Sequence, residues 1–318
     1  MVLKRILQDM RVFFRLIRWK NLLMIVVLQY FLQYFFLIPK LEEHRLTPVL
    51  DDFHFALLVL STVIIAAGGY IINDIYDYNI DRINKPDRQT LGKHLSLRKA
   101  MRFYFFVLLI GLLLAVYLAW YVNNLFLAGL YIGAVMSLWL YSKVLKRTAL
   151  GGNIFVGLFC AFTAIIVAFA ERETIFNVLE GDWYDFKDLA FQFGIFSLFA
   201  FFSTLFREII KDIEDMEGDR LNNCHTLPIA YGIPFAKNVA TAVNTVLFLI
   251  LIYLAGIFLT EGLYMRLVYL SIFIVLPVLA NEFLLRRAKT KKQYHFLSQF
   301  AKYIMFSGIF LILIMKVN

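Results

Sequence analysis

Long apolar runs recur along the whole chain, and they constrain its fold more than any other feature. An α-helix rises 1.5 Å per residue, so about 20 apolar residues span a hydrocarbon core of about 30 Å. Hydrophobic residues make up 61% of the 318 residues, well above the roughly half of a soluble domain. The expected fold class is therefore an all-α integral membrane protein, a single transmembrane domain over residues 1–318. We predict nine spans, near residues 21–39, 55–73, 102–121, 124–141, 149–170, 189–206, 238–259, 264–285 and 299–315.

Two local features refine this arrangement. The stretch "VNN" at 122–124 is all that separates the third and fourth spans, which predicts an antiparallel helical hairpin. Pro277 lies inside the eighth span, and a proline at such a position favours a kink that neighbouring helices accommodate.

The basic residues predict the orientation of the spans. With nine spans, 25 of the 32 Lys and Arg residues fall on the side that holds the N-terminus, 6 fall on the other side, and Lys302 lies within the ninth span. Loops rich in Lys and Arg stay in the cytoplasm. We therefore expect a multi-pass protein of the cell membrane with a cytoplasmic N-terminus and an outer C-terminus. The net charge of +9 reflects this topology and an attraction to anionic membrane lipid, so no nucleic-acid partner is expected.

Residues 1–20 form a basic segment without the apolar core of a cleavable signal peptide. Their apolar positions recur at a spacing of three to four residues, as in an amphipathic helix that lies in the membrane interface. A basic flank that only fixes the topology explains the same residues equally well.

Two acidic motifs with the same spacing follow the second and sixth spans. "NDIYDYNIDRIN" (73–84) and "DIEDMEGDRLN" (212–222) both fit D-x-x-D-x-x-x-D-R-x-N. If each motif continues its span as a helix, its three aspartates lie within roughly 60° of one another. Both stripes belong to the cytoplasmic face of the predicted topology. The six aspartates are Asp74, Asp77, Asp81, Asp212, Asp215 and Asp219.

Six carboxylates in one partly desolvated cleft repel each other, so this arrangement requires bound cations. On this basis, removing one carboxylate is expected to stabilise the metal-free protein. Oxygen ligands without His or Cys favour Mg²⁺ over other metals, and Mg²⁺ shares its ligand shell with substrate phosphate oxygens. The predicted metal ligands are the six aspartates and the amide oxygen of Asn73. A solvated acidic loop is the simpler explanation of one such motif, but not of two with identical spacing.

Basic residues lie where a diphosphate would require them. They are Arg82, Lys85 and Arg88 after the first motif, Arg207, Lys211 and Arg220 around the second, and Lys143, Lys146 and Arg147 at the end of the fourth span, next to Tyr141. Lys and Arg neutralise phosphate charge and favour the departure of a phosphate leaving group. The positive-inside rule alone also accounts for basic residues on this face.

These motifs resemble those of the UbiA superfamily of intramembrane prenyltransferases. "NDIYDYNID" is similar to the family's first aspartate-rich signature, "KDIEDMEGD" to its second, and "YSKVLKR" (141–147) to the motif after its fourth helix. The resemblance implies nine helices around a central cavity that is capped by the cytoplasmic motif-bearing loops. It also implies Mg²⁺-dependent transfer of a polyprenyl group from a polyprenyl diphosphate to a lipophilic acceptor, with Asp74, Asp77, Asp212, Asp215, Lys146 and Arg147 as catalytic residues and Asn73 as a further diphosphate contact.

The acceptor is left open by the sequence. "REIIKDIEDMEGD" and "GGNIFVG" are most similar to the branch that transfers geranylgeranyl to geranylgeranylglyceryl phosphate for ether lipids. Aromatic prenyltransferases of quinone biosynthesis share much of this pattern and are the alternative. Two other classes of membrane protein fit the sequence less well. CDP-alcohol phosphotransferases require a D-G-x-x-A-R signature that the chain lacks, and a cation transporter would carry ionisable residues deep within its spans. No protein partner can be inferred.

Overall fold

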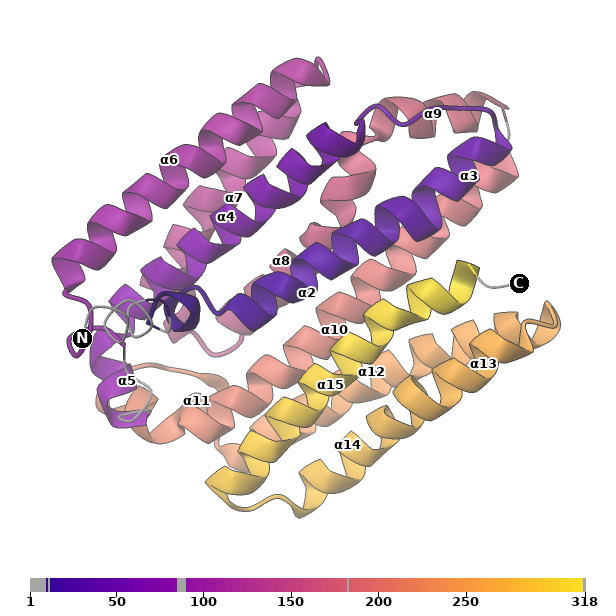
Figure 1. Ribbon diagram of the computed structural model, residues 1–318. Coiled ribbons are helices and arrows are strands. Elements are labelled where there is room, and N and C mark those ends of the chain that lie inside the picture. Colours follow the sequence, from indigo (N-terminus) through magenta and orange to yellow (C-terminus); the bar gives the residue numbers. More distant parts are fainter. Residues whose placement is uncertain (1–9, 11, 85–89, 182, 317–318) are drawn as a thin grey trace. The chain divides into compact units, whose positions relative to one another are not determined.

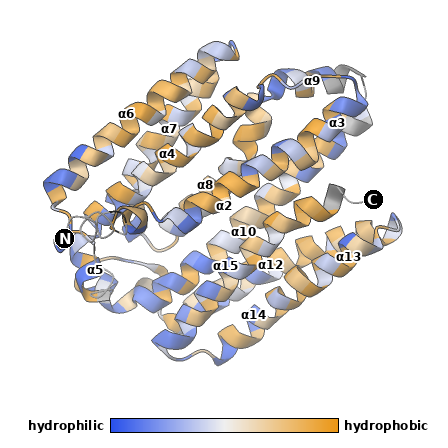
Figure 2. Ribbon diagram, in the orientation of Figure 1, coloured by the Kyte–Doolittle hydropathy of each residue, from blue (hydrophilic) through white to orange (hydrophobic). Residues whose placement is uncertain are grey.

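The computed structural model describes residues 10, 12–84, 90–181 and 183–316, and their regular elements are all helical (Figure 1). Within this part of the chain nine helices are long and apolar enough to cross a membrane, in agreement with the nine predicted spans. Hydrophobic residues fill the middle of the long helices and hydrophilic residues gather near their ends (Figure 2). The nine are Trp19–Glu43, Asp52–Tyr76, Leu97–Tyr121, Leu125–Arg147, Gly151–Ala170, Phe186–Leu221, Ile233–Thr260, Tyr264–Arg287 and Lys291–Ile314.

The chain divides into two compact units, which are described separately. The first comprises Met1–Val27, Leu50–Arg147 and Glu217–Cys224, as far as these ranges are described. The single-domain organisation and the central cavity stay predictions. The elements of the first unit are the start of α2 (Trp19–Phe31), α4 (Asp52–Tyr76), α5 (Tyr78–Asn84), α6 (Leu97–Tyr121), α7 (Leu125–Lys143), the 3₁₀ turn η3 (Leu145–Arg147) and the end of α10 (Trp183–Leu221).

In the first unit α4, α6 and α7 pack side by side (Figure 1). Small residues allow α4 and α6 to approach closely. The Ser61 hydroxyl donates to the Gly111 carbonyl at 3.0 Å, and a Cβ at Gly111 would come within 2.8 Å of Ile65. Such small-residue contacts drive helix association where lipid removes the hydrophobic advantage of burying apolar side chains.

The expected hairpin joins α6 and α7 through residues 122–124. The amide of Asn124 donates to the Ala119 carbonyl at 2.7 Å, and Asn123 has a φ of 48°. Asparagine adopts this left-handed conformation more readily than most residues, which explains why "VNN" reverses the chain so tightly.

The described part of the N-terminal segment packs on α4 and α6. Residues 12–16 are helical, Leu16 is buried in one cluster with Ile71, Ile72 and Tyr104, and the Phe13 ring contacts Phe103 edge-on. Residues 1–9 and 11 lie outside the described residues, so the interfacial helix stays a prediction there.

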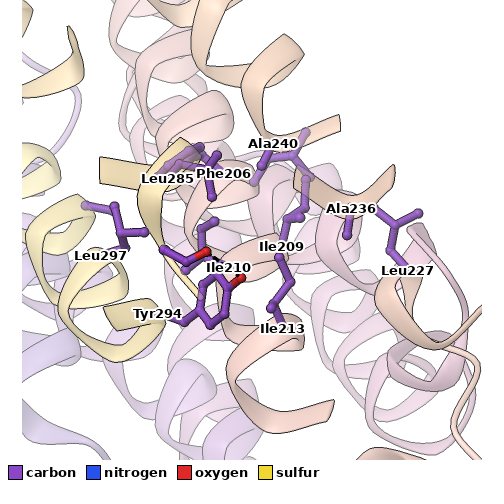
Figure 3. Close-up of a cluster of buried hydrophobic side chains, with 13 residues drawn as sticks. Phe206, Ile209, Ile210, Ile213, Leu227, Ala236, Ala240, Leu285, Tyr294 and Leu297 are labelled. Carbon is purple, nitrogen blue, oxygen red and sulfur yellow. Dashed lines mark hydrogen bonds between the residues drawn. The ribbon is translucent and has the colours of Figure 1, made fainter. Parts of the chain in front are cut away.

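The second unit comprises Leu28–Val49, Thr148–Met216 and His225–Asn318, again within the described residues. Its main core is a cluster around Phe206, Ile209, Ile210 and Ile213 of α10, packed against residues of α11, α12, α14 and α15 (Figure 3). The elements are the π-helix η1 (Leu32–Leu37), α3 (Ile38–Glu43), α8 (Gly151–Ala170), α9 (Arg172–Gly181), most of α10, α11 (Leu227–Tyr231), α12 (Ile233–Thr260), α13 (Tyr264–Leu270), the π-helix η4 (Ser271–Val275), α14 (Leu276–Arg287) and α15 (Lys291–Lys316).

Both π-helical segments stand just before a proline in the second unit. η4 ends two residues before Pro277, and η1 ends two residues before Pro39. Proline has no N–H group and its ring clashes with the carbonyl four residues earlier, so the regular hydrogen-bond ladder widens there. The irregularity expected at Pro277 therefore takes the form of one π-helical turn.

Candidate functional site

The first acidic motif forms the end of α4 and the whole of α5. α4 ends at Tyr76, Asp77 caps it, and α5 begins at Tyr78. Helical backbone hydrogen bonds nevertheless run through the junction, from the Asp77 amide to the Asn73 carbonyl (2.9 Å) and from the Asp81 amide to the Asp77 carbonyl (2.8 Å). The predicted continuation of the span is thus confirmed, with a one-residue interruption at Asp77.

Asp77 lies at the centre of a buried polar cluster in the first unit. Its side chain is 6% exposed, and the Asn73 amide donates to its Oδ2 at 2.8 Å. The Lys146 ammonium donates to the same Oδ2 and to the Asn73 amide oxygen, the latter at 3.3 Å. Three residues from the first motif and the turn after α7, all predicted to belong to the site, are therefore in direct contact.

Asp74 is held by a residue that the sequence did not point to. Nη2 of Arg18 donates to Asp74 Oδ1 at 2.7 Å, and the guanidinium lies 5.0 Å from the centroid of the Tyr70 ring. Burial lowers the pKa of Arg18, but Asp74, Tyr70 and Asp81 together outweigh it, so the pKa is raised above its ordinary value. Arg18 also has a φ of 51°, a conformation that costs roughly 1–2 kcal/mol for a non-glycine residue. The ion pair and the ring contact offset part of this strain.

Asp219, the last aspartate of the second motif, belongs to the first unit together with the first motif. It is buried, and its carbonyl accepts a hydrogen bond from the Cys224 amide at 2.9 Å. Burial and the Asp219 carboxylate raise the pKa of the Cys224 thiol, whereas Arg147 and Lys146 lower it. Cys224 thus lies within electrostatic range of three predicted site residues of this unit.

The other predicted basic residues of the first unit are less enclosed. Lys143 is exposed, and its ammonium lies 4.6 Å from the Trp139 ring centroid in a cation–π contact. Arg82 and Arg147 are exposed, and Tyr141 is half-buried. Lys85 lies outside the described residues.

The second acidic motif lies on one uninterrupted helix, α10, which runs from Trp183 to Leu221. At 100° per residue, its three aspartates fall within about 60° of one another, as predicted. Ile210 lies on the opposite side of α10 and, with Ile209 and Ile213, fills the core of the second unit (Figure 3). Burial of the apolar side therefore fixes the direction in which the acidic side points.

Asp212 is held by an amide from α8. Nδ2 of Asn153 donates to Asp212 Oδ2 at 2.8 Å, and Asn153 is buried. Asn153 is the third residue of α8, within the stretch "GGNIFVG". A single amide in an otherwise apolar span was the available signal, because polar residues within spans are expensive and mark functional positions.

One turn before Asp212, a single carboxylate binds two cations. Glu208 Oε1 accepts from Nη1 of Arg207 at 2.6 Å, and its Oε2 accepts from Lys211 at 2.9 Å. The side chains are 13%, 17% and 26% exposed for Glu208, Arg207 and Lys211, so the network is largely shielded from solvent. The predicted residue Lys211 is thus positioned by Glu208, which was not among the predicted site residues.

The described residues contain no group of three or more His, Cys, Asp or Glu side chains arranged to hold a metal ion. Instead, Asp77 and Asp74 each hold a cation, and Asp212 holds an amide. The expected repulsion within the acidic motifs is therefore relieved by side chains of the protein itself. The carboxylate and amide oxygens of the two motifs can still bind a hard cation whose other ligands are water or substrate oxygens.

Comparison with known proteins decides the family. The sequence model of the UbiA prenyltransferase family matches residues 45–303. The chain belongs to the UbiA prenyltransferase family. The apolar helices and this membership make it a multi-pass integral membrane protein.

A relative from Sulfurisphaera tokodaii, named digeranylgeranylglyceryl phosphate synthase, is 34% identical over 192 residues, which are 60% of this chain. The match spans about three fifths of that relative's length (61%). Seven further relatives that are 30–36% identical carry the same name.

Two solved UbiA-type structures share the fold. A structure described as giving insights into digeranylgeranylglyceryl phosphate synthase in membranes is 24% identical and has a TM-score of 0.63, with 98% of this chain and 99% of the other covered. A UbiA homologue from Archaeoglobus fulgidus bound to GPP and Mg²⁺ is 16% identical, with a TM-score of 0.55 and coverage of 95% and 99%.

Proposed function

We propose that this UbiA family member transfers a geranylgeranyl group from geranylgeranyl diphosphate to geranylgeranylglyceryl phosphate. The observation that carries the proposal is the contact of Asn73, Asp77 and Lys146, which joins two of the motifs by which the chain resembles prenyltransferases. The relatives named digeranylgeranylglyceryl phosphate synthase support the choice of acceptor. In this reaction the C1–O bond of the allylic diphosphate breaks, the acceptor hydroxyl oxygen bonds to C1, and the hydroxyl proton is released.

The donor set fits Mg²⁺. The proposed ligands offer only carboxylate and amide oxygens, the chemistry that Mg²⁺ prefers. Mg²⁺ usually takes one or two carboxylates together with waters and substrate phosphate oxygens, so it does not require three protein carboxylates at one point. A homologue's structure with GPP and Mg²⁺ supports this choice. When bound, the ion stabilises negative charge on the departing diphosphate. The proposed ligands are Asn73, Asp74, Asp77, Asp81, Asp212, Asp215 and Asp219.

We propose a second role for the cations that hold the first motif. Before the substrate arrives, Lys146 and Arg18 neutralise Asp77 and Asp74. When metal and diphosphate bind, the same cations lie beside the phosphate oxygens and donate charge-assisted hydrogen bonds to them. Arg147, in the same 3₁₀ turn as Lys146, is also proposed to bind the diphosphate. The remaining proposed diphosphate contacts are Asn73, Arg82, Lys85, Tyr141, Lys143 and Lys211.

We propose that both motifs face the cytoplasm and that the protein lies in the cell membrane. The support is the excess of Lys and Arg on the side that holds the N-terminus and the motif-bearing loops. The C-terminus then lies outside.

The test is an acceptor competition. Full-length protein in lipid nanodiscs receives labelled geranylgeranyl diphosphate, Mg²⁺, and equal amounts of geranylgeranylglyceryl phosphate and 4-hydroxybenzoate. We expect label in the digeranylgeranyl lipid. Label in the aromatic acceptor would assign the chain to quinone biosynthesis, and no label in either acceptor, together with cation flux in liposomes, would favour the transporter.

A further inference from the structure

Arg207 carries a hydrogen-bond donor that the structure leaves without a partner. Its Nη1 binds Glu208, but its Nε is shielded from solvent and has no hydrogen-bond partner among the described residues. A buried donor without a partner costs about 1–3 kcal/mol, so such groups require an explanation. Nε and Nη2 form the side of the guanidinium that binds two oxygens of a phosphate at once. The edge that Glu208 leaves open is therefore the one suited to a phosphate.

The position of Arg207 separates it from the proposed metal ligands. It precedes Asp212 by five residues on the continuous helix α10, which corresponds to about 7.5 Å along the axis. At about 100° per residue, Arg207 lies about 40° around the helix from Lys211 but about 140° from Asp212. A phosphate at Arg207 is thus distinct from an anion that shares metal with Asp212.

The proposed reaction involves two different anionic headgroups. The donor carries a diphosphate, and the acceptor carries a phosphate monoester that must stay bound while its hydroxyl reacts. Lys146 and Arg18, which hold the first motif, are proposed above to serve the diphosphate. A second cationic position is then needed for the monoester.

We infer that Arg207 binds the phosphate of the acceptor lipid and that Glu208 is its positioning residue. This inference rests on the proposed function and names the substrate group that one further residue recognises. Glu208 binds Arg207 through one oxygen and Lys211 through the other. One carboxylate therefore fixes the distance between Arg207, which is inferred to bind the acceptor phosphate, and Lys211, which is proposed to bind the diphosphate. Arg207 and Lys211 should therefore affect different substrates, although both bind Glu208.

The first test is steady-state kinetics in nanodiscs with each substrate varied separately. Arg207→Gln should raise the KM for geranylgeranylglyceryl phosphate by about 10- to 150-fold and leave the KM for geranylgeranyl diphosphate unchanged. Lys211→Gln should do the reverse. Arg207→Lys keeps the charge and one donor for Glu208, so it should fold and show an intermediate acceptor KM. Arg286→Gln, in an exposed ion pair with Glu282 of the same unit, is the matched control and should change neither value.

The second test uses geranylgeranylglycerol, an acceptor without the phosphate. The wild-type protein should have a higher KM for geranylgeranylglycerol than for geranylgeranylglyceryl phosphate, by about the factor by which Arg207→Gln raises the KM for the phosphorylated acceptor. Arg207→Gln should have similar KM values for the two acceptors. An unchanged preference in Arg207→Gln, or a defect confined to the diphosphate donor, would overturn the inference.

Equilibrium binding separates this inference from the proposed function. The melting temperature of the wild-type protein is measured without donor, with geranylgeranylglyceryl phosphate or geranylgeranylglycerol added. We expect stabilisation by the phosphorylated lipid only, and its loss in Arg207→Gln. This result without any transfer activity would support the phosphate site and contradict the proposed reaction. Transfer activity with equal stabilisation of wild type and Arg207→Gln would overturn the phosphate site alone.

Discussion

The Lys146 ammonium binds both Asp77, which lies 69 positions earlier in the sequence, and Asn73. The Asp77 side chain is 6% exposed and that of Lys146 is 29% exposed, so the two charges compensate each other largely out of water. This contact ties the end of α4 to the turn after α7 within the first unit. It also changes what is expected from mutating the acidic motif.

The first prediction is that Asp77 and Lys146 stabilise the metal-free protein as a pair. From the sequence alone, loss of one carboxylate relieves repulsion and should stabilise. In the structure, Asp77→Asn leaves the Lys146 charge without its counter-ion, so the variant should be less stable. A double-mutant cycle with Lys146→Met, measured by thermal unfolding without Mg²⁺, should give a coupling of about 0.5–3 kcal/mol.

The control for this cycle is the i,i+4 pair of Glu282 and Arg286, in which the Arg286 side chain is 73% exposed. Its coupling should be about 0.3–0.5 kcal/mol, because solvent screens exposed pairs. A coupling of Asp77 with Lys146 no larger than this would show that the buried pair does not stabilise the resting protein.

The second prediction concerns diphosphate binding by the turn after α7. Lys146→Gln and Arg147→Gln should each raise the KM for the prenyl diphosphate by about 10- to 150-fold, since each removes a charge-assisted contact. Arg147→Lys should recover only part of the loss, because an ammonium cannot bind two oxygens as a guanidinium does. Arg102→Gln, an exposed arginine of α6, is the control. A defect seen only in the acceptor KM, or only in membrane insertion, would remove these residues from the diphosphate site.

The third prediction concerns topology. Thr47 and His94 are both exposed and lie in loops on opposite sides of the second span. A membrane-impermeant maleimide added to intact cells should label Thr47→Cys and leave His94→Cys unlabelled until the membrane is opened. The parent chain, whose Cys160 lies in a span and whose Cys224 is buried, gives the background. The reverse labelling pattern is incompatible with a cytoplasmic N-terminus.

The helices and the two motifs could be predicted because their signals are local. About 20 consecutive apolar residues identify a span wherever its neighbours lie. The acidic spacing defines a stripe on any helix that contains it, and α10 carries such a stripe without a break. Pro277 likewise predicted an irregularity in its helix, but the sequence did not show that this irregularity would be a π-helical turn.

The partners of the aspartates could not be predicted, because they depend on tertiary packing. Arg18 reaches Asp74 only because the chain turns at residues 17–18 and Leu16 packs into the core of the first unit. Asn153 meets Asp212 from another helix, at a separation of 59 residues. Sequence spacing within one helix carries no information about such contacts.

The most direct test of the central claim combines transfer and metal dependence. Purified protein in nanodiscs receives labelled geranylgeranyl diphosphate and geranylgeranylglyceryl phosphate, with Mg²⁺ or with EDTA. The wild-type protein should form labelled digeranylgeranylglyceryl phosphate only with Mg²⁺, and Asp77→Asn and Asp212→Asn should lower the rate by about 100-fold or more. Asp188→Asn, an exposed aspartate at the other end of α10, should keep the wild-type rate. Near-normal Mg²⁺-dependent transfer by both motif variants would contradict the assignment of the two acidic motifs to the active site.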